Sequence, residues 1–450
     1  MSRLSFRKIF GFLMVNFTLA AATVPAMGAG YGLRESASAT AFGSANAGGT
    51  ASADDISYMF FNPAGLTRQS GSQFLVGGQA IFPELTFEGG SASTVLTTPI
   101  TGTPHDDDAG VNAVAPSLYG MWSLDDRTRL GLGVTVPWGL ETDHPEGWIG
   151  RYHALNSKLV SVNFNPAVAR RYGNLSIGGG VQVQYTTVNL SNAADFGTVG
   201  SVLGVGGSVP GAQDGKAEFD GSDVGFGFNL GVLYEFSKQT RVGLAYRSMI
   251  SHDLDGDTIF TLDSAGIGAA LVAGTGAFVN TGSHAKLSTP ETLSVGVHHD
   301  VNDRWSVMAD VVWTAWSRLQ NFRITFDNAA QTDDVTTAEW DDTFFFALGT
   351  AYKANPAWTF RGGVAFDQSP VPDSTRNPRI PDEDRTWFSV GASYHGFKGV
   401  RVDAAYTHFF IDDSEINLTT AIPGNTFRGN LNGDFALTSD LFSIQAVVNF

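Results

Sequence analysis

Apolar and polar side chains alternate with a period of two along most of the chain, which is the pattern of a β-strand with two different faces. The clearest example is the segment 225–236. Successive strand side chains point to opposite faces, so one face of this segment is aromatic or aliphatic and the other is mostly glycine and polar. The two faces are Phe226, Phe228, Leu230, Val232, Tyr234 and Phe236 against Gly225, Gly227, Asn229, Gly231, Leu233 and Glu235.

The same alternation predicts fourteen strands, near 72–83, 111–124, 128–138, 157–172, 175–190, 222–236, 240–262, 285–300, 304–328, 339–353, 357–368, 386–395, 399–420 and 438–450. Short links such as 125–127 and 301–303 alternate with long ones such as 191–221 and 263–284. An antiparallel barrel with both termini in the periplasm has short periplasmic turns and long external loops. The pattern therefore favours an all-β fold, a 14-stranded antiparallel transmembrane β-barrel, over a soluble sandwich or propeller.

The composition fits a barrel with one apolar and one polar face. Charged residues make up 16% of the 450 residues, aromatic residues make up 12%, and the mean hydropathy is −0.01. Soluble domains usually carry about 25% charged residues. The net charge of −17 argues against a nucleic-acid partner, because phosphates are bound by clustered Lys and Arg. The absence of Cys excludes disulfides, thiolate metal sites and Cys catalysis.

Residues 1–28 have the organisation of a secretory signal peptide. Arg3, Arg7 and Lys8 give a positive start, the run 9–22 is almost wholly apolar, and Ala26 and Gly28 are small residues at the −3 and −1 positions of a cleavage site. The alternative is a transmembrane anchor, but a span needs roughly 20 apolar residues and this run is shorter. No later stretch has 18 consecutive apolar residues, so a closed barrel is the structure that would satisfy the backbone in lipid. The predicted location is the bacterial outer membrane.

The chain ends with an alternating strand whose last residue is Phe450. Such an ending resembles the assembly signal of bacterial outer-membrane proteins, so we expect the barrel assembly machinery as a partner. Outer-membrane lipid and lipopolysaccharide are expected around the apolar face. A closed barrel has no free strand edge that needs a partner, which predicts a monomer.

Residues 29–70 do not alternate. They are rich in Ala, Ser and Gly, include Asp54 and Asp55, and could not bury a core alone. Before a barrel they would form a plug in its lumen or, alternatively, a flexible periplasmic tail.

Several segments resemble the FadL family of outer-membrane transporters for long-chain fatty acids and other hydrophobic compounds. The family-like segments are 29–35, a hatch motif at Asn62, Pro63, Ala64 and Gly65, and the strands 224–248 and 313–317. The most specific is the block 358–387, WTFRGGVAFDQSPVPDSTRNPRIPDEDRTW. The similarity extends over essentially the whole mature chain.

The resemblance implies the same fourteen-stranded barrel, over 71–450, with residues 29–70 as a hatch inside its lumen. It also implies passive uptake without a cofactor or nucleotide hydrolysis. A hydrophobic ligand would bind an external groove, move to an internal pocket, and leave sideways through a gap in the wall when the hatch moves.

The external groove is expected from two long loops, 191–221 and 263–284, because both are apolar for segments that should face water. The candidate substrate-binding residues are Phe196, Val199, Val202 and Leu203 in the first loop, with Val205, and Ile267, Leu271, Val272 and Phe278 in the second. Alternatively, these side chains pack only against one another in short helices.

The third predicted strand ends in Pro137, Trp138 and Gly139. Proline removes a donor from the strand ladder and glycine weakens a strand. The family resemblance implies that this strand kinks inward and leaves a lateral opening; an ordinary strand end is the alternative.

Arg323 lies where fatty-acid-carrying members of the family can place a basic residue in the lumen. It would pair with a substrate carboxylate through a charge-assisted hydrogen bond. An ion pair with a hatch or wall carboxylate is the alternative. The facing position is expected at Thr186 or Thr187 and is not basic. This leaves neutral hydrocarbons open as substrates.

No set of residues predicts catalysis or a metal site. The nine His residues are scattered, and Asp253, Asp255 and Asp257 lack the Gly and Glu spacing of a calcium loop. The charged block 376–385 is expected to be a salt-bridged structural loop. The Gly266-Ile267-Gly268 sequence lacks the third glycine and the βαβ setting of a dinucleotide site, so no cofactor is expected.

The sequence thus predicts a FadL-type transporter, not an enzyme, for long-chain fatty acids or related hydrophobic molecules. The first alternative is a carrier of aromatic or alkane hydrocarbons on the same scaffold. The second is an outer-membrane adhesin or phage receptor that uses the same loops, and the third is a barrel lipid hydrolase.

Overall fold

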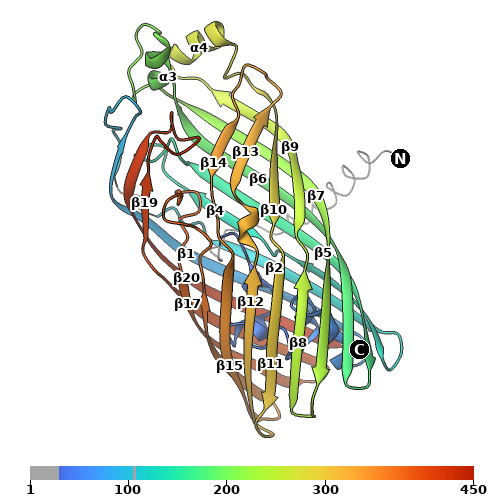
Figure 1. Cartoon of the computed structure of the whole chain (residues 1–450). Helices are drawn as coiled ribbons and strands as arrows, with labels where there is room; N and C mark the ends of the chain where they lie inside the picture. Colours follow the sequence, from blue (N-terminus) through green and yellow to red (C-terminus); the bar gives the residue numbers. More distant parts are fainter. Residues whose placement is uncertain (1–29, 105–107) are drawn as a thin grey trace, which may run out of the picture.

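The computed structural model describes residues 30–104 and 108–450 (Figure 1). The expected signal peptide, 1–28, lies outside the described residues. The helical elements are η1 (Arg34–Ala37), α2 (Ala39–Phe42), η2 (Ile56–Phe60), η3 (Pro63–Arg68), α3 (Phe196–Leu203), α4 (Ile267–Thr275) and η4 (Trp316–Arg318). Over the two described ranges, no helix is long and apolar enough to cross a membrane.

The strands form one sheet. They are β1 (Gln73–Ser93), β2 (Ala113–Ser123), β3 (Thr128–Thr135), β4 (Gly139–Asp143), β5 (Asn156–Tyr172), β6 (Leu175–Asp195), β7 (Asp214–Glu235), β8 (Thr240–Arg247), β9 (Ile250–Thr261), β10 (Thr281–Thr289), β11 (Thr292–Asp300), β12 (Trp305–Thr314), β13 (Asn321–Phe326), β14 (Asp334–Thr337), β15 (Thr343–Asn355), β16 (Trp358–Asp367), β17 (Arg385–Phe397), β18 (Val400–Ile411), β19 (Ser414–Leu418) and β20 (Asn430–Asn449).

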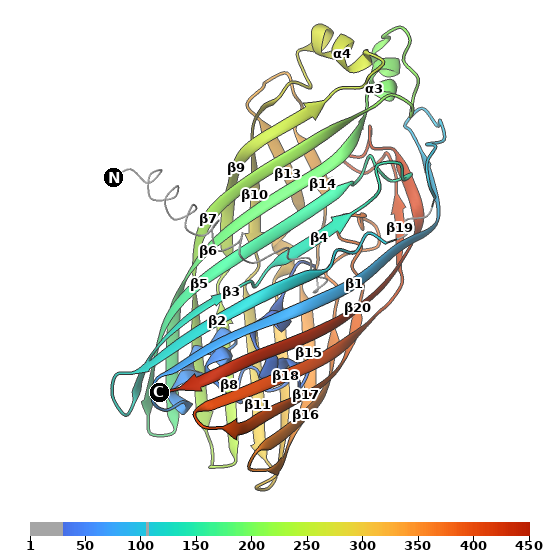
Figure 2. The same ribbon diagram turned by 180° about the vertical axis from the view of Figure 1, so that it is seen from behind.

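The sheet closes on itself because β1 pairs antiparallel with β20, from Gln73 with Asn449 to Ser93 with Asn430. The pairs β3/β4, β8/β9, β10/β11, β12/β13, β14/β15 and β18/β19 are each one interrupted span of the wall. The structure therefore confirms the prediction of a 14-strand antiparallel barrel. Figure 2 shows the continuous wall from β20 through β1 to β7.

The two faces of β7 differ as their residues predict. Phe226, Phe228 and Leu230 point outward and are about half exposed, whereas Asn229 is buried on the inner face, where its side chain donates to Asn165 Oδ1 at 3.1 Å. In lipid, apolar side chains belong outside and polar ones inside. Averaging the two faces explains the near-zero mean hydropathy.

Several predicted strand ends are wrong by more than a few residues. β6 continues to Asp195 and β7 begins at Asp214. The sequence predicts that β6 ends at residue 190 and β7 begins at 222, with residues 191–221 as a loop. β1 runs on through Pro83 to Ser93, and the predicted strand 304–328 is interrupted by η4. Pro83 is tolerated in β1 because the β2 ladder has already ended, at the pair Ile81–Ala113.

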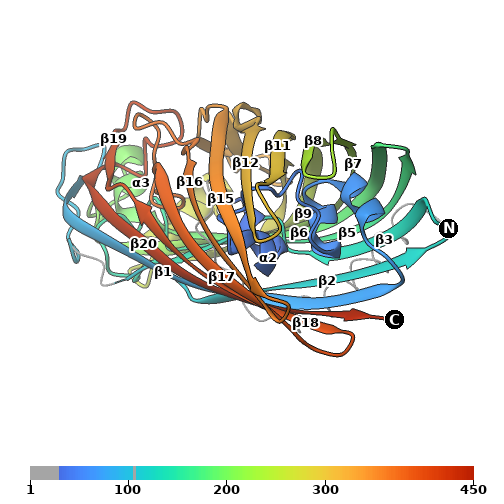
Figure 3. The same ribbon diagram turned by 90° about the horizontal axis from the view of Figure 1, so that it is seen from below.

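The segment 30–72, which precedes β1, lies inside the barrel (Figure 3). Nearly all its described side chains are buried, α2 contacts β17, β18 and β20, and η3 contacts β5, β6 and β7 on the opposite wall. We call residues 30–72 the lumenal segment. Its packing matches a plug and not a free tail.

Buried ion pairs attach the middle of the lumenal segment to the wall. Arg401 pairs with Asp55, and also with Asp403 at 3.0 Å, while Arg361 lies 3.3 Å from Asp54. Asp55 and Asp403 are buried and the other three groups are partly buried, so removing one partner would leave a largely desolvated charge unpaired. This half of the segment is therefore strongly fixed.

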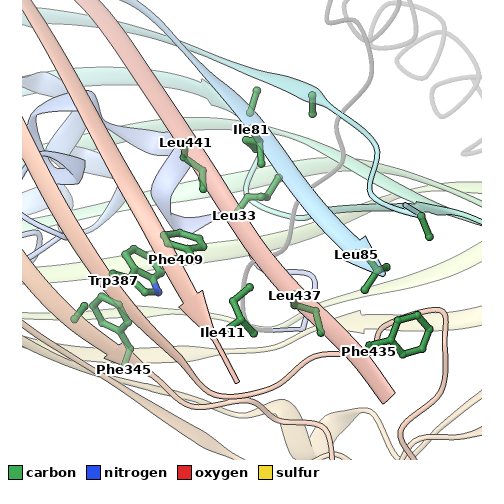
Figure 4. Close-up of a cluster of buried hydrophobic side chains, with 14 of the residues drawn as sticks. Leu33, Ile81, Leu85, Phe345, Trp387, Phe409, Ile411, Phe435, Leu437 and Leu441 are labelled. Atoms are coloured by element: carbon green, nitrogen blue, oxygen red, sulfur yellow. The ribbon is translucent and has the colours of Figure 1, made fainter. Parts of the chain in front are cut away.

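The largest apolar cluster joins the start of the lumenal segment to the wall (Figure 4). Leu33 belongs to it, together with Phe345, Trp387 and Phe409 from β15, β17 and β18. The ring centroids of Trp387 and Phe409 are 4.5 Å apart, and those of Phe345 and Trp387 are 5.1 Å apart. The interior is thus packed around the lumenal segment.

Candidate functional site

A cavity of about 590 Å³ is lined by residues of α3 and by the last residue of α4, Thr275. Figure 1 shows these two helices at one end of the barrel. The walls of the cavity come from α3, the outer ends of β6, β7, β9, β13 and β14, and the loops that follow α4 and β19. Most of its large side chains are aromatic or aliphatic, namely Leu190, Phe196, Leu203, Phe219, Phe260, Phe278, Phe322, Ile324, Phe326 and Phe427. We call this space the outer cavity.

The structure brings some of the predicted groove residues to this cavity and not others. Phe196, Val199, Leu203 and Phe278 line it. Ile267 and Leu271 are buried behind it, where α4 packs on Phe196 of α3. These two therefore pack within the helix pair, as the alternative interpretation held.

Val202 and Val272 do not line the outer cavity. Val202 points away from it on α3 and is 48% exposed, and Val272 is partly buried on α4. α3 begins after Asp195, whose side chain accepts a hydrogen bond of 2.8 Å from the N–H of Thr198, and this cap fixes the helix over the cavity.

Sequence reasoning missed the lining residues on strands. Phe219 lies on the part of β7 that precedes the predicted strand start at 222, inside the expected loop 191–221. Phe260 lies within the predicted strand 240–262, and the sequence gives no sign that its side chain lines a cavity. Phe322, Ile324 and Phe326 alternate along β13, and that alternation was a usable signal for one inward face.

A second, smaller cavity of about 90 Å³ lies deeper in the lumen. It shares Leu190, Phe322, Thr336 and Arg379 with the outer cavity, so the two spaces meet at these side chains. Its other lining residues include Leu140, Leu159, Val188, Leu287, Leu319 and Ile380. We call this space the inner pocket and the four shared residues the neck.

Arg323 is not at the neck, and the prediction that it lies in the lumen is wrong. Its neighbours Phe322 and Ile324 face the outer cavity, so the intervening side chain points outward. Arg323 is 53% exposed and lies 2.9 Å from Asp333. The structure thus pairs it with a carboxylate on the neighbouring loop.

Three cationic residues line the two cavities. Arg428 pairs with Asp334, and Lys158 Nζ lies 2.9 Å from Glu141 Oε2. Arg379 is the third, and over residues 30–104 and 108–450 it makes no ion pair. Burial lowers the pKa of Arg379 to about 9; the nearby charge of Arg428 acts in the same direction and that of Asp334 opposes it. A pKa of about 9 still leaves Arg379 a cation at neutral pH.

The other arginines of the predicted structural loop are paired. Arg376 pairs with Glu383 and with Asp373 at 2.9 Å, and Arg385 pairs with Asp382. This part of the block 376–385 is the salt-bridged loop that its composition indicates.

An aromatic cluster around Tyr31 separates the inner pocket from a third cavity, which Pro137 and Trp138 line. Tyr31 has ring centroids 4.8 Å from Trp316 and 5.8 Å from both Trp138 and Trp340, and its hydroxyl donates to Ser288 O at 2.9 Å. Tyr31 and Trp340 line the inner pocket. Trp138 and Trp316 line the third cavity, of about 80 Å³. Tyr31, a residue of the lumenal segment, therefore divides the two spaces.

The third span of the wall is interrupted at Pro137 and Trp138. β3 pairs with β5 as far as Thr135–Asn163, and β4 resumes at Gly139–Val160, so three residues face two across the break. On the other side the β2–β3 ladder ends at Leu118–Val134. Proline supplies no N–H to either ladder, which is consistent with a break here.

The residues at the break, Pro137 to Gly139, form hydrogen bonds with the lumenal segment in place of a neighbouring wall strand. The N–H of Leu33 donates to Pro137 O at 2.8 Å, the N–H of Gly139 donates to Tyr31 O at 2.9 Å, and Gly32 and Trp138 form an isolated antiparallel bridge. The start of the lumenal segment thus acts as a short extra strand beside the kinked span.

The Asn62-Pro63-Ala64-Gly65 motif fixes the end of the lumenal segment. Asn62 caps η3, and its amide donates to Thr50 O at 2.8 Å and to Val232 O at 3.0 Å. η3 can approach the wall because Gly231 has no side chain, since a Cβ there would overlap the Asn62 amide oxygen and lie 2.9 Å from Pro63 Cδ. The motif is an anchor in this structure.

Across the residues that the structure describes, no group of three or more His, Asp or Glu side chains could hold a metal ion. Asp255 points outward and lies 3.2 Å from His284.

A family model for outer membrane transport proteins (OMPP1/FadL/TodX) matches residues 19–450. The chain is 32% identical to a putative outer membrane protein of Neisseria meningitidis serogroup B, over 97% of this chain and 98% of that one. It is 29% identical to the long-chain fatty acid transport protein of Escherichia coli K12, over 87% and 90%.

Solved structures agree with these sequence matches. The crystal structure of a FadL homologue of Pseudomonas aeruginosa superposes with a TM-score of 0.86 at 25% identity, over 94% of this chain and all (100%) of that one. The Ralstonia pickettii toluene transporter has the same fold, with a TM-score of 0.64 at 21% identity over 89% and 95%. The chain therefore belongs to the FadL/TodX family of outer-membrane transport proteins.

Proposed function

We propose that this protein takes up long-chain fatty acids or related hydrophobic molecules passively across the outer membrane. The observation that carries the proposal is that an apolar outer cavity and an apolar inner pocket meet at the neck. A hydrophobic molecule avoids water and the polar lipopolysaccharide layer, so a stepwise apolar path helps it where a water-filled pore would not. The name of the E. coli relative also supports fatty acids as ligands.

The second half of the route depends on the start of the lumenal segment. A ligand in the inner pocket contacts Tyr31, and Tyr31 is tied through its carbonyl to Gly139 of the kinked span. Displacement of Tyr31 would connect the inner pocket with the cavity lined by Pro137 and Trp138. It would also release the kinked span from Leu33, so the ligand could leave sideways between β2 and β3.

Movement would be limited to the start of the lumenal segment. Residues near Asp54, Asp55 and Asn62 are attached to the wall by ion pairs and the η3 anchor. Residues 30–36 are held by backbone hydrogen bonds, by the Gly30 N–H donating to Asp382 Oδ2 at 2.9 Å and by the Ser36 hydroxyl donating to Val136 O at 3.0 Å. A bound ligand would replace the apolar contacts of Tyr31, and the freed polar groups would need new partners when these residues move. The hatch is therefore proposed to move as a short arm on a fixed base.

The other expected properties are part of the same proposal. The protein is a monomeric carrier and not an enzyme. Its exposed outer face contacts membrane lipid and lipopolysaccharide, and its terminal strand β20, ending beside Phe450, is recognised by the barrel assembly machinery.

The test is uptake of labelled oleate by a deletion strain with and without the restored gene. The proposal predicts faster uptake with the gene. Aromatic or alkane hydrocarbons are the second candidate, favoured by the aromatic lining of the outer cavity and the shared fold of the toluene transporter. A gene-dependent difference for toluene or hexadecane but not for oleate would establish that candidate instead. Phage or cell binding with no uptake difference would refute both.

A further inference from the structure

Arg379 is held at the neck by neutral acceptors. It comes from the loop between β16 and β17 and reaches the opposite wall, where it is 8% exposed. Its Nη1 donates to Ser157 Oγ at 3.0 Å and to the carbonyls of Asn156 and Ser191 at 3.2 Å, and its Nη2 donates to Asn192 Oδ1 at 3.2 Å. These contacts fix the guanidinium but do not neutralise its charge.

The missing counter-ion distinguishes Arg379 from its neighbours. Arg428 and Lys158 line the same two cavities, and each has a carboxylate partner. A buried cation without a counter-ion is costly, and proteins normally pair such a charge. Within the described ranges, Arg379 Nε also donates no hydrogen bond to the protein. A charge and a donor therefore remain for a group that enters the cavity.

We propose that Arg379 binds the carboxylate of an amphipathic acid, so that the transporter selects ionised acids over neutral molecules of the same length. This inference rests on the proposed uptake function and narrows its substrate class. The guanidinium suits the role because its planar donors match a carboxylate and stay charged at neutral pH. The carboxylate of Asp334 near the neck is already paired with Arg428, so the acid supplies the negative charge that balances Arg379.

The cavity volumes give the orientation of the bound acid. The outer cavity, at about 590 Å³, has room for a long acyl chain, and the inner pocket, at about 90 Å³, does not. With the carboxylate at Arg379, the tail therefore lies in the outer cavity against Phe322 and Phe326. The acid enters head first.

The test compares dodecanoate with dodecan-1-ol, which has the same tail and no charge, binding to the purified full chain in detergent. At about pH 8 the acid is ionised and Arg379 is protonated. Because a hydrogen bond to a charged group is worth about 1.5–3 kcal/mol, the wild type should prefer dodecanoate by about tenfold to a hundredfold. Arg379→Gln should remove this preference and leave alcohol affinity within about twofold, and Arg379→Lys should keep part of it.

The matched control is Arg304→Gln. It neutralises an exposed arginine on the short turn before β12, which lines neither cavity, and should change neither affinity. Equal affinity of the wild type for the two probes, or unchanged dodecanoate binding by Arg379→Gln, would overturn the assignment. If Arg379→Gln does not fold, the wild-type preference and the Arg379→Lys variant decide. Failure of the wild type to bind either probe would instead count against the proposed uptake function.

Discussion

The backbone N–H of Gly139 donates a hydrogen bond of 2.9 Å to the carbonyl oxygen of Tyr31. Gly139 begins β4, directly after the kink in the wall, and the Tyr31 side chain forms part of the floor of the inner pocket. One residue thus contacts both the proposed ligand space and the proposed exit. This coupling accounts for how a ligand could open its own way out without any other source of energy.

Leu203 and Val202 are neighbours on α3 and both are exposed, but only Leu203 lines the outer cavity. Comparing them therefore tests whether a ligand contacts the cavity wall or any exposed apolar side chain. Leu203 lines the outer cavity and is 57% exposed, whereas Val202 is 48% exposed and does not line it. Leu203→Ser should weaken binding of a long-chain ligand by roughly fivefold, because about 1 kcal/mol of apolar contact is lost. Val202→Ser should have little effect. Titration of both purified variants with the same ligand checks the difference, and equal losses would mean that the outer cavity is not the binding site.

Gly231→Ala should loosen the lumenal segment, because the new Cβ would overlap the Asn62 amide oxygen. The expected result is a leakier barrel, measured as greater sensitivity of cells to a large antibiotic that the outer membrane normally excludes. Gly78→Ala is the matched control, since its Cβ would meet only the Ala115 carbonyl oxygen at 3.9 Å. Unchanged sensitivity in properly assembled Gly231→Ala would contradict the anchoring role of the Asn62 motif.

Acid should loosen the loop between β4 and β5, which contains His153. Burial lowers the pKa of His153 to about 3, and the charge of Arg428 adds to this. The unfolded pKa is about 6.5, so between about pH 6.5 and pH 3 the unfolded state binds more protons than the folded one. Stability is therefore complete above about pH 6.5 and falls as the pH drops, by about 2 kcal/mol at pH 5.

Limited proteolysis of residues 144–155 at about pH 5 and pH 7.5 measures this loss. The wild-type loop should be cut faster at the lower pH, and His153→Gln should show a smaller difference because it cannot be protonated. The same acid effect in both proteins would mean that a group other than His153 causes it.

The wall could be predicted because lipid imposes a simple rule on every membrane-spanning strand. Phe226, Gly227 and Phe228 follow that rule, and so do the other alternating segments. The alternation is not required in the parts of strands that extend beyond the membrane, because both faces of a strand can be polar there. The first part of β7, Asp214–Gly221, pairs with β6 without such alternation, so its sequence predicts a loop where the structure has a strand.

Only those parts of the site that lie within a single segment of sequence could be predicted. The two apolar loops indicated the outer cavity, and Pro137 indicated a break in the third span. Sequence alone could not show that Arg323 points outward or that Arg379 lacks a counter-ion. Arg376, Arg379 and Arg385 look alike in sequence, and only the positions of distant carboxylates distinguish them.

We propose that ligand passes Tyr31 only when the start of the lumenal segment leaves the kinked span. Gly32 and Trp138 are direct partners in the bridge that joins them, and the native chain has no Cys. The double variant Gly32→Cys/Trp138→Cys would form one disulfide there, because bridge partners lie within the Cα separation that a disulfide needs. Oleate uptake by cells carrying this variant should be blocked when the disulfide is oxidised and restored on reduction, the reduced form being its own control. Equal uptake by the oxidised and reduced forms would contradict the account.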